Sequence, residues 1–247
     1  MGDMGRRVRW FSCGAASAVA TYLDLQTNPG HVIAYCETGA EDADNARFMA
    51  DCEKLFGVQI TRLRSPNFSD TWSVWEKRRY MSGIAGAPCT SELKIGPRLD
   101  FQKPGDVHVF GYTADGPDVK RAEQFRANYP DLTMEAPLIE RGLNKAACLA
   151  LLEKWGIEPP RVYAMGFRNA NCIPCVKATS PDYWSLVRRE FPDEFQRAAT
   201  LSREIGCRLA RVNDERVFID EIPDDWPTTE PIAPACDFLC HVAGIDQ

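Results

Sequence analysis

The stretch that decides the fold is Val8-Arg9-Trp10-Phe11-Ser12-Cys13-Gly14-Ala15-Ala16-Ser17-Ala18-Val19-Ala20. Its apolar start predicts a strand over Val8–Phe11, and its small residues predict a loop that opens a helix over Ala16–Leu25. The backbone N–H groups of Ser12, Gly14 and Ser17 are expected to be free and to point at one spot, beside the positive end of this helix. Such a nest favours a phosphate or sulfate group.

The spacing of this loop separates it from the two best-known nucleotide motifs. It reads Ser-x-Gly-x-x-Ser, whereas the dinucleotide fingerprint is G-x-G-x-x-G and the Walker loop ends in G-K-[ST]. A turn of small residues without any ligand would have the same composition. The anion-binding prediction therefore depends on the rest of the chain.

The remaining sequence alternates predicted strands with predicted helices. The expected strands are His31–Tyr35, Val58–Leu63, Asp106–Gly111 and Leu132–Ala136; the expected helices are Asp44–Phe56, Asp70–Arg78, Asn144–Trp155, Pro181–Glu190 and Pro192–Ile205; and a hairpin is expected over Arg208–Val212 and Arg216–Ile219. Strands that alternate with helices pair in parallel, because each helix forms the right-handed crossover that joins two parallel strands. The predicted fold class is therefore α/β, with a Rossmann-like doubly wound and mainly parallel sheet. Residues 1–178 would form this domain, and 179–247 a helical, cysteine-containing extension within one structural unit.

Composition narrows the function classes. A formal net charge of −6 over 247 residues argues against a general nucleic-acid-binding surface. No apolar stretch approaches the ~20 residues of a membrane helix, and Met1–Arg7 lacks the apolar region of a signal peptide, so we expect a cytoplasmic protein. Ten cysteines in such a chain indicate metal or redox chemistry before disulfides.

Polar segments follow three of the predicted strands. They are the loop Ser12–Ser17, the segment Cys36–Glu41 and the pair Gly111-Tyr112. Ligands of parallel α/β sheets bind beyond the carboxyl ends of the strands. We therefore expect the three segments to face one crevice, which strengthens the nucleotide interpretation.

Five segments in the same order resemble motifs of the phosphoadenosine phosphosulfate reductase family. This family is a branch of the adenine nucleotide alpha-hydrolase, or PP-loop, superfamily. The segments are Ser12–Ser17, Glu37-Thr38-Gly39-Ala40-Glu41, Pro88-Cys89-Thr90-Ser91-Glu92-Leu93-Lys94, Gly111-Tyr112 followed by Arg121, and Gly166–Lys177. The resemblance covers most of the chain and is closest to the branch that bears an iron–sulfur cluster.

The resemblance implies a set of nucleotide-binding residues. The backbone of Ser12, Cys13, Gly14, Ala15, Ala16 and Ser17 would hold the anionic end of an adenosine nucleotide, with Glu37, Thr38 and Gly39 near the adenosine and Gly111 beside the loop. Lys94 is the candidate for contact with sulfate or phosphate. Arg121 and Arg168 are further candidates because a guanidinium suits such oxyanions. The alternative for each cation is a solvated surface position.

Two departures from the family pattern bear on the reaction. Ala15-Ala16 stands where the family loop commonly has Lys-Asp, which argues against Mg²⁺-assisted cleavage of ATP between the alpha and beta phosphates. Thr90 follows Cys89 where cluster-bearing relatives have a cysteine pair.

Cysteine spacing predicts a metal centre. Cys172 and Cys175 form a C-x-x-C in a polar segment without helical pattern, which lets two thiolates reach one metal. The resemblance adds Cys89 as a ligand of a 4Fe–4S cluster, with Cys236 or Cys240 as a possible fourth and Cys240 taken as the candidate. Zinc held by Cys172, Cys175, Cys236 and Cys240, a redox dithiol, and inert packing are the alternatives. Three further thiols are expected to pack in the core: Cys52, Cys148 and Cys207.

The chain ends in Ala235-Cys236-Asp237-Phe238-Leu239-Cys240-His241. Sulfonucleotide reductases carry their nucleophilic cysteine near this end, so the resemblance implies that Cys236 or Cys240 is catalytic. A thiol there attacks the sulfate sulfur and holds a thiosulfonate for later reduction.

Three functions remain open on the sequence. The first is thiol- and cluster-dependent reduction of adenylyl sulfate or its 3′-phosphorylated form, with a thioredoxin-like reductant. The second is ATP-dependent sulfur transfer to transfer RNA or DNA. The third is a non-catalytic nucleotide- or metal-binding module. An aromatic trio, Trp72, Trp75 and Tyr80, could stack on nucleic acid, but at helical spacing we expect it to belong to the core.

Overall fold

The computed structural model describes residues 5–28, 30 and 32–235. The terminal thiols Cys236 and Cys240, and with them the catalytic and fourth-ligand predictions, lie outside the described residues. Within the described part of the chain, no helix is long and apolar enough to cross a membrane.

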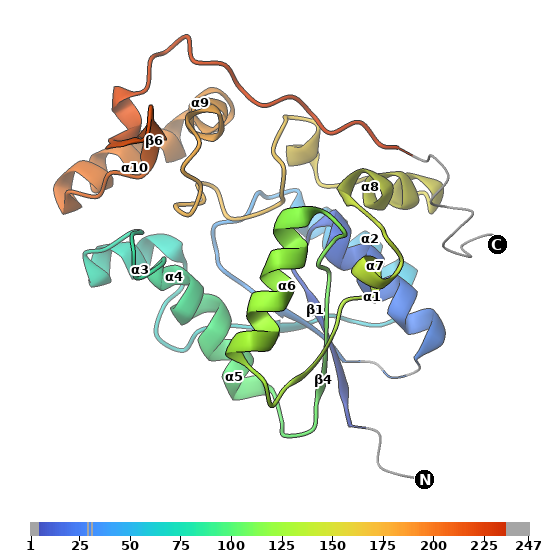
Figure 1. Ribbon diagram of the computed structural model, residues 1–247. Coiled ribbons are helices and arrows are strands. Elements are labelled where there is room, and N and C mark those ends of the chain that lie inside the picture. Colours follow the sequence, from blue (N-terminus) through green and yellow to red (C-terminus); the bar gives the residue numbers. More distant parts are fainter. Residues whose placement is uncertain (1–4, 29, 31, 236–247) are drawn as a thin grey trace.

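Five parallel strands form the central sheet (Figure 1). They are β1 (Arg7–Phe11), β2 (Val32–Cys36), β3 (Thr61–Leu63), β4 (Val107–Phe110) and β5 (Thr133–Glu135), in the order β3-β2-β1-β4-β5. The chain builds outward from β1 on one side and then crosses to β4 on the other. The strand order therefore reverses between β1 and β4, where open α/β sheets bind ligands.

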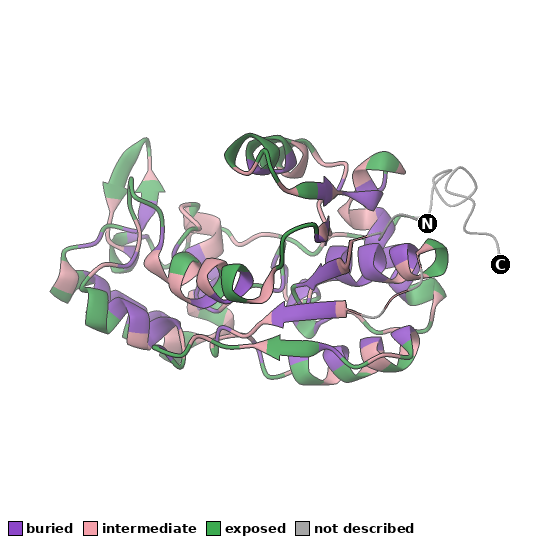
Figure 2. Ribbon diagram, turned by 90° about the horizontal axis from the view of Figure 1, so that it is seen from below, coloured by how far each residue is buried: buried purple, intermediate pink, exposed green. Residues whose placement is uncertain are grey.

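Helices cover both faces of the sheet. Phe11 on β1 packs on Phe48 and Phe56 of α2 (Asn45–Phe56), on the same side as α1 (Ala15–Thr27). On the opposite face Trp10 meets Phe101 at the end of α5 (Gly96–Phe101). The predicted doubly wound α/β sheet is confirmed, and its central strands are buried while the edge strand β3 is exposed (Figure 2).

Two further helices lie where the sequence predicts them. The helix α8 (Lys145–Lys154) begins where the Asn144 side chain accepts a hydrogen bond from the Ala147 N–H at 2.9 Å. The capping carboxylate of Asp70 opens α3 (Thr71–Arg78) by accepting from Ser73 N–H at 2.7 Å. Capping groups of this kind satisfy backbone donors that the first turn of a helix leaves free.

The sequence pattern missed three segments. Residues 137–140 form the short helix α7 (Pro137–Glu140). Residues 116–128 form α6 (Gly116–Asn128), in which only Ala122 and Phe125 are buried, so its apolar periodicity is too sparse to read. Residues 88–101 form one winding unit, in which α4 (Pro88–Thr90), the π-helical turn η1 (Ser91–Ile95) and α5 follow without a break. Lys94 and Arg98 thereby stand about one helical turn apart.

The C-terminal part contains the predicted helical pair, α9 (Pro181–Glu190) and α10 (Pro192–Ile205), and the hairpin of β6 (Ala210–Val212) and β7 (Glu215–Val217). A short turn, η3 (Ile219–Glu221), follows. The segment 223–235 then runs back toward α8, as the red ribbon of Figure 1 shows. Along the way Thr229 Oγ1 donates a hydrogen bond to the Gly166 carbonyl at 2.8 Å. One buried apolar cluster includes residues of the sheet layer and of α9 and α10. The division at residue 178 stays a prediction.

Two predictions about side chains are confirmed by burial. Trp72 and Trp75 pack edge to face with ring centres 4.9 Å apart, and they are 7% and 0% exposed, so they belong to the core, whereas the third aromatic residue, Tyr80, is only half-buried. Three thiols are likewise buried: Cys52, Cys148 and Cys207.

Candidate functional site

The Ser12–Ser17 loop connects β1 to α1 at the point where the strand order reverses. Cys13 adopts a left-handed backbone conformation with φ of 58°, and the thiol is fully buried beneath the loop. The N–H groups of Ser12 and Gly14 donate to Ser17 Oγ at 3.0 and 3.4 Å. The prediction that these two amides are free is therefore wrong, because the Ser17 side chain folds back onto the loop.

Tyr163 holds the loop from the outside. Tyr163 is the last residue of the short helix η2 (Arg161–Tyr163). Its hydroxyl accepts a hydrogen bond from the Ala15 N–H at 3.1 Å. The backbone directly after strand β4 also lies close to the loop, because a Cβ added to Gly111 would lie 2.6 Å from the Ser17 Cα. Glycine is needed at this position because the two backbones approach so closely.

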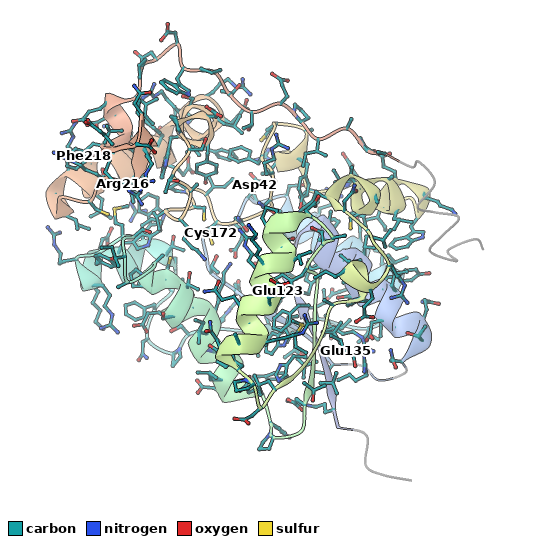
Figure 3. The ribbon with its side chains drawn as sticks, in the orientation of Figure 1. Asp42, Glu123, Glu135, Cys172, Arg216 and Phe218 are labelled. Carbon is teal, nitrogen blue, oxygen red and sulfur yellow. The ribbon has the colours of Figure 1, made fainter. Side chains whose placement is uncertain are left out.

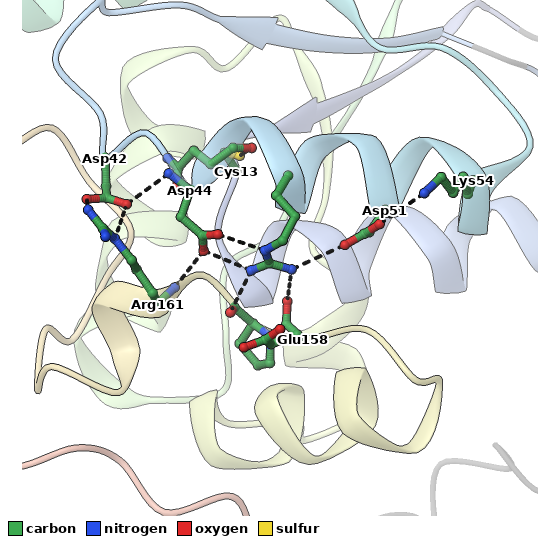
Figure 4. A network of polar contacts seen from close by, with 10 residues as sticks. Cys13, Asp42, Asp44, Asp51, Lys54, Glu158 and Arg161 are labelled. Carbon is green, nitrogen blue, oxygen red and sulfur yellow. Dashed lines mark hydrogen bonds and ion pairs between the residues drawn. The ribbon is translucent and has the colours of Figure 1, made fainter.

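Ion pairs fix the segment that carries Tyr163 (Figure 4). Arg161 makes two hydrogen bonds with the buried carboxylate of Asp42, at 2.8 and 2.7 Å. Arg47 of α2 binds Asp44 at 2.7 Å and also donates to the Pro159 carbonyl at 3.1 Å. The hydrogen bond from Arg47, supported by the Arg161 N–H, holds the pKa of Asp44 below its usual value.

A cavity of about 290 Å³ opens between the carboxyl ends of β1 and β4. We call it the aromatic cavity, and its wall is mostly apolar: Trp10, Phe11, Tyr35, Ile95, Phe110 and Tyr112. Ser12 and Ser17 close one side, and Lys94 and Arg98 bring positive charge. Its volume lies near the lower end of the range for ligand pockets, and apolar walls with few polar groups are typical of them.

A smaller cavity of about 160 Å³ continues past the loop. Gly14 and Ser17 line it together with Arg121, Lys145 and Asn169. Arg121 is exposed and already paired with Asp118 at 2.9 Å. The position of Arg121 therefore suits the predicted contact with an anion, but that contact would compete with the ion pair to Asp118.

The third cavity, about 600 Å³ in volume, contains the cysteines that the sequence singled out. Cys89, Cys172 and Cys175 all line this cysteine cavity, which lies between α3 and α4 on one side and α9 on the other. Figure 3 places Cys172 between the sheet layer and the C-terminal helices. Cys89 and the distant C-x-x-C, which the sequence predicts to share a metal centre, therefore line the same cavity.

Two buried polar groups of α3 line the cysteine cavity, and both side chains are 1% exposed or less. The Thr71 hydroxyl has no hydrogen-bond partner among the described residues. The Trp75 indole N–H points at the Cys89 thiol and opposes the rise in its pKa that burial causes. Arg168 and Lys177 add exposed positive charge to the same wall. Buried donors that lack partners are rare in folded proteins. This lining is suited to sulfur or to an anion.

Lys94 and Cys172 line both the aromatic and the cysteine cavities. The protein surrounds Lys94, although its side chain keeps solvent contact through the cavity, and burial lowers its pKa. The nearby Cys172 and Glu41 outweigh this effect, so the pKa is raised overall. Burial raises the pKa of Cys172 to about 11, against the opposing charge of Lys94. Cys172 Sγ also lies 2.8 Å from Thr38 Oγ1.

Other predicted residues lie away from the aromatic cavity. Glu37 forms an ion pair with Arg64 at 2.6 Å and lines none of the three cavities. Gly39 has φ of 65°, and a Cβ there would lie 2.5 Å from the Ser69 carbonyl oxygen, so it serves a turn. Thr38 lines the cysteine cavity rather than the aromatic one.

The metal predictions are not resolved by the described residues. Within 5–28, 30 and 32–235, no three Cys, His, Asp or Glu side chains come together as a metal-binding group. Cys89, Cys172 and Cys175 share one cavity, and the fourth predicted ligand, Cys240, lies outside these residues. The donor set is compatible with a thiolate-bound metal, and the choice between 4Fe–4S and zinc stays a prediction.

Sequence reasoning missed Arg98, Tyr163 and the donors Thr71 and Trp75. Only Arg98 had a usable signal, since it follows Lys94 by four residues, the spacing of one helical face.

Comparisons with known proteins bear on the fold. A solved structure of phosphoadenylyl-sulfate (PAPS) reductase from Candida auris, in complex with phosphate, superposes with a TM-score of 0.53. The match covers 69% of this chain and 82% of that protein, at 9% sequence identity. The chain has the fold of a PAPS reductase. No protein-family model matches the sequence, and no curated protein is similar to it at a significant level.

Proposed function

We propose that this protein is a sulfonucleotide reductase-like enzyme, which binds an adenosine nucleotide with an activated sulfate and reduces that sulfate to sulfite. The observation that carries the proposal is the wall shared by the aromatic cavity and the cysteine cavity. A cation, Lys94, and a thiol, Cys172, stand where an apolar cavity near nucleotide size meets a cavity lined by cysteines. The PAPS reductase fold supports the same reaction class.

The adenosine would lie in the aromatic cavity. Its base and ribose fit the apolar wall formed by Trp10, Phe110 and Tyr112. The 5′ anion would lie between the Ser12–Ser17 loop and Lys94. There it would replace Ser17 Oγ as acceptor for the amides of Ser12 and Gly14, because a charged acceptor makes the stronger hydrogen bond.

The chemistry is a thiol attack on sulfur. A cysteine thiolate forms an S–S bond to the sulfate sulfur, the bond from sulfur to the phosphate oxygen breaks, and the adenosine phosphate leaves. A dithiol reductant of thioredoxin type then supplies two electrons, departs as a disulfide and releases sulfite from the restored thiol. Lys94 and Arg168 would stabilise the negative charge that develops. The family resemblance gives the nucleophile as Cys236 or Cys240.

Cys89, Cys172 and Cys175 would hold a 4Fe–4S cluster in this proposal. When bound, the cluster would supply electrostatic and redox tuning next to the sulfate. The unpartnered Thr71 hydroxyl and the Trp75 indole N–H beside Cys89 fit such a group, because hydrogen bonds to cluster sulfurs are a common means of adjusting it. Iron and sulfide analysis after anaerobic purification tests this part, and stoichiometric zinc without iron would replace the cluster by zinc.

The reaction is tested by supplying adenylyl sulfate or its 3′-phosphorylated form with a dithiol reductant. We expect sulfite release and a cysteine adduct detectable by mass spectrometry. Cys236→Ser or Cys240→Ser should abolish release while nucleotide still binds. If iron is present and nucleotide binds, yet neither adduct nor sulfite forms, reduction is wrong and sulfur transfer becomes the better account.

A further inference from the structure

His108 is a buried, titratable side chain that the proposed reaction does not use. It lies on β4, is 0% exposed, and lines neither the aromatic cavity nor the other two. The indole N–H of Trp10, on the neighbouring strand β1, donates to His108 Nδ1 at 3.0 Å. The two ring planes differ by 5°, so the N–H bond runs nearly parallel to the imidazole plane, in which the Nδ1 lone pair lies.

This hydrogen bond fixes the protonation state of the imidazole. A ring nitrogen that accepts a hydrogen bond carries no proton, so the proton of the neutral ring lies on Nε2, which has no partner among the described residues. A second proton would have to enter at Nδ1, where the indole N–H already points. Burial lowers the pKa of His108 from its usual 6.5. The Asp106 carboxylate opposes this shift, and the guanidinium groups of Arg98 and Arg6, from α5 and from the segment before β1, add to it.

Trp10 depends on this acceptor because its other neighbours are apolar. The indole lines the aromatic cavity and packs on Phe101 and Phe110, with ring centres 6.2 and 6.3 Å away. These phenyl rings hold the indole but offer its N–H no acceptor. At 8% exposure Trp10 has little access to water, and a buried donor that loses its partner is costly. The hydrogen bond to His108 therefore selects one orientation of the indole.

We propose that His108 is a positioning residue, which fixes the orientation of the Trp10 indole in the wall of the aromatic cavity and so prepares that wall for the base of a nucleotide. The inference rests on the proposed function, because the orientation matters for activity only if a nucleotide binds in this cavity. The imidazole leaves an unpaired Nε2–H in the core, a cost that an apolar side chain of similar size would avoid. Its presence is explained by the indole that it orients rather than by packing.

Two variants of His108 separate orientation from packing. In His108→Asn the amide oxygen takes the place of Nδ1 as acceptor, although the smaller side chain leaves space in the core. His108→Leu fills that space but leaves the indole N–H without an acceptor. We expect His108→Leu to bind adenosine 5′-monophosphate about fivefold more weakly than the wild-type protein in calorimetry, the factor for one neutral hydrogen bond. His108→Asn should bind within about twofold of wild type, even with the lower melting temperature of the two variants.

Trp10→Phe tests whether the effect passes through the indole. In this background His108→Leu should no longer change the affinity, because the N–H group that His108 accepts is gone. The indole N–H resonance of Trp10, identified by its loss in Trp10→Phe, gives a readout without ligand. Its chemical shift should be kept in His108→Asn and should change in His108→Leu.

The outcomes decide the inference separately from the proposed function. Affinity that follows the melting temperature, with His108→Asn binding more weakly than His108→Leu, would make His108 a packing residue and overturn the inference. A Trp10 resonance that stays unchanged in His108→Leu would also overturn it. If the wild-type protein binds no nucleotide, the proposed function fails, and the resonance in the ligand-free variants still decides whether His108 orients Trp10.

Discussion

The Ser12–Ser17 loop and the wall formed by α3, η1 and α5 differ in whether their hydrogen-bond donors have partners. In the loop, the N–H groups of Ser12, Gly14 and Ala15 all have acceptors within the protein. In the wall, Thr71 and Arg98 carry buried donors that have no partner among the described residues. A fold that satisfies one side of its crevice and leaves the other unsatisfied indicates where a ligand must supply acceptors. The loop sets the shape of the site, and the wall carries most of its unused binding capacity.

The largest effect is expected where the loop is packed most closely. Gly111→Ala would place a Cβ 2.6 Å from Ser17 Cα and 2.7 Å from Ser17 N, and backbone atoms cannot move aside cheaply. We expect a loss of about 3 kcal/mol in the free energy of unfolding, measured by denaturant titration. Gly116→Ala is the control, because a Cβ there meets nothing within 4 Å. Equal stability of the two variants would show that the loop is not closely packed.

The next effect concerns a cation of the wall. Lys94→Met should weaken nucleotide binding by about 30-fold, because hydrogen bonds to charged groups contribute about 1.5–3 kcal/mol. Arg121→Met should change the affinity by about threefold or less, since its charge is already paired and solvated. The measurement is isothermal titration with one nucleotide against both variants. A larger loss for Arg121 would move the anion site away from the shared wall.

A smaller effect is expected where a single hydrogen bond supports the loop. Tyr163→Phe removes the acceptor of the buried Ala15 N–H and should lower the free energy of unfolding by about 1–2 kcal/mol. Nucleotide affinity should change less than in Lys94→Met. If Tyr163→Phe affects binding more than stability, the hydroxyl contacts the ligand rather than the loop.

The smallest effect concerns pH. The folded protein lowers the pKa of Asp44 from its usual 3.8 through the hydrogen bond from Arg47. The carboxylate therefore stabilises the fold at pH values above 3.8, and this contribution disappears as pH falls through the lower, folded-state pKa. Asp44→Asn should cost under about 1 kcal/mol at neutral pH, since the pair is partly exposed. The gap between the two unfolding curves should close in acid, and a gap that widens would contradict this assignment.

The sequence predicted the parts of this molecule that depend on apolar pattern and chain order. The strand over Val8–Phe11, the loop after it and the arrangement of the sheet follow from such patterns. The direction of Glu37 did not, because a motif places a segment near the crevice but leaves the side chain free to pair with Arg64. The state of the loop amides depended on the rotamer of Ser17, which no pattern encodes. Arg98 and Thr71 became candidates only through burial without a partner, which requires the whole fold.

The central claim is that the proposed nucleotide lies in the aromatic cavity, next to the cysteine cavity, and thiol footprinting tests it most directly. Chelator-treated, reduced protein would be labelled with iodoacetamide at mildly alkaline pH, since burial raises the pKa of Cys172 and of Cys36 to about 11. A saturating adenosine nucleotide should slow the labelling of these two thiols, which line the aromatic cavity. The labelling rates of Cys89 and Cys175, which line only the cysteine cavity, should not change. If calorimetry shows the nucleotide bound while Cys172 is labelled at an unchanged rate, the nucleotide lies elsewhere and the account is contradicted.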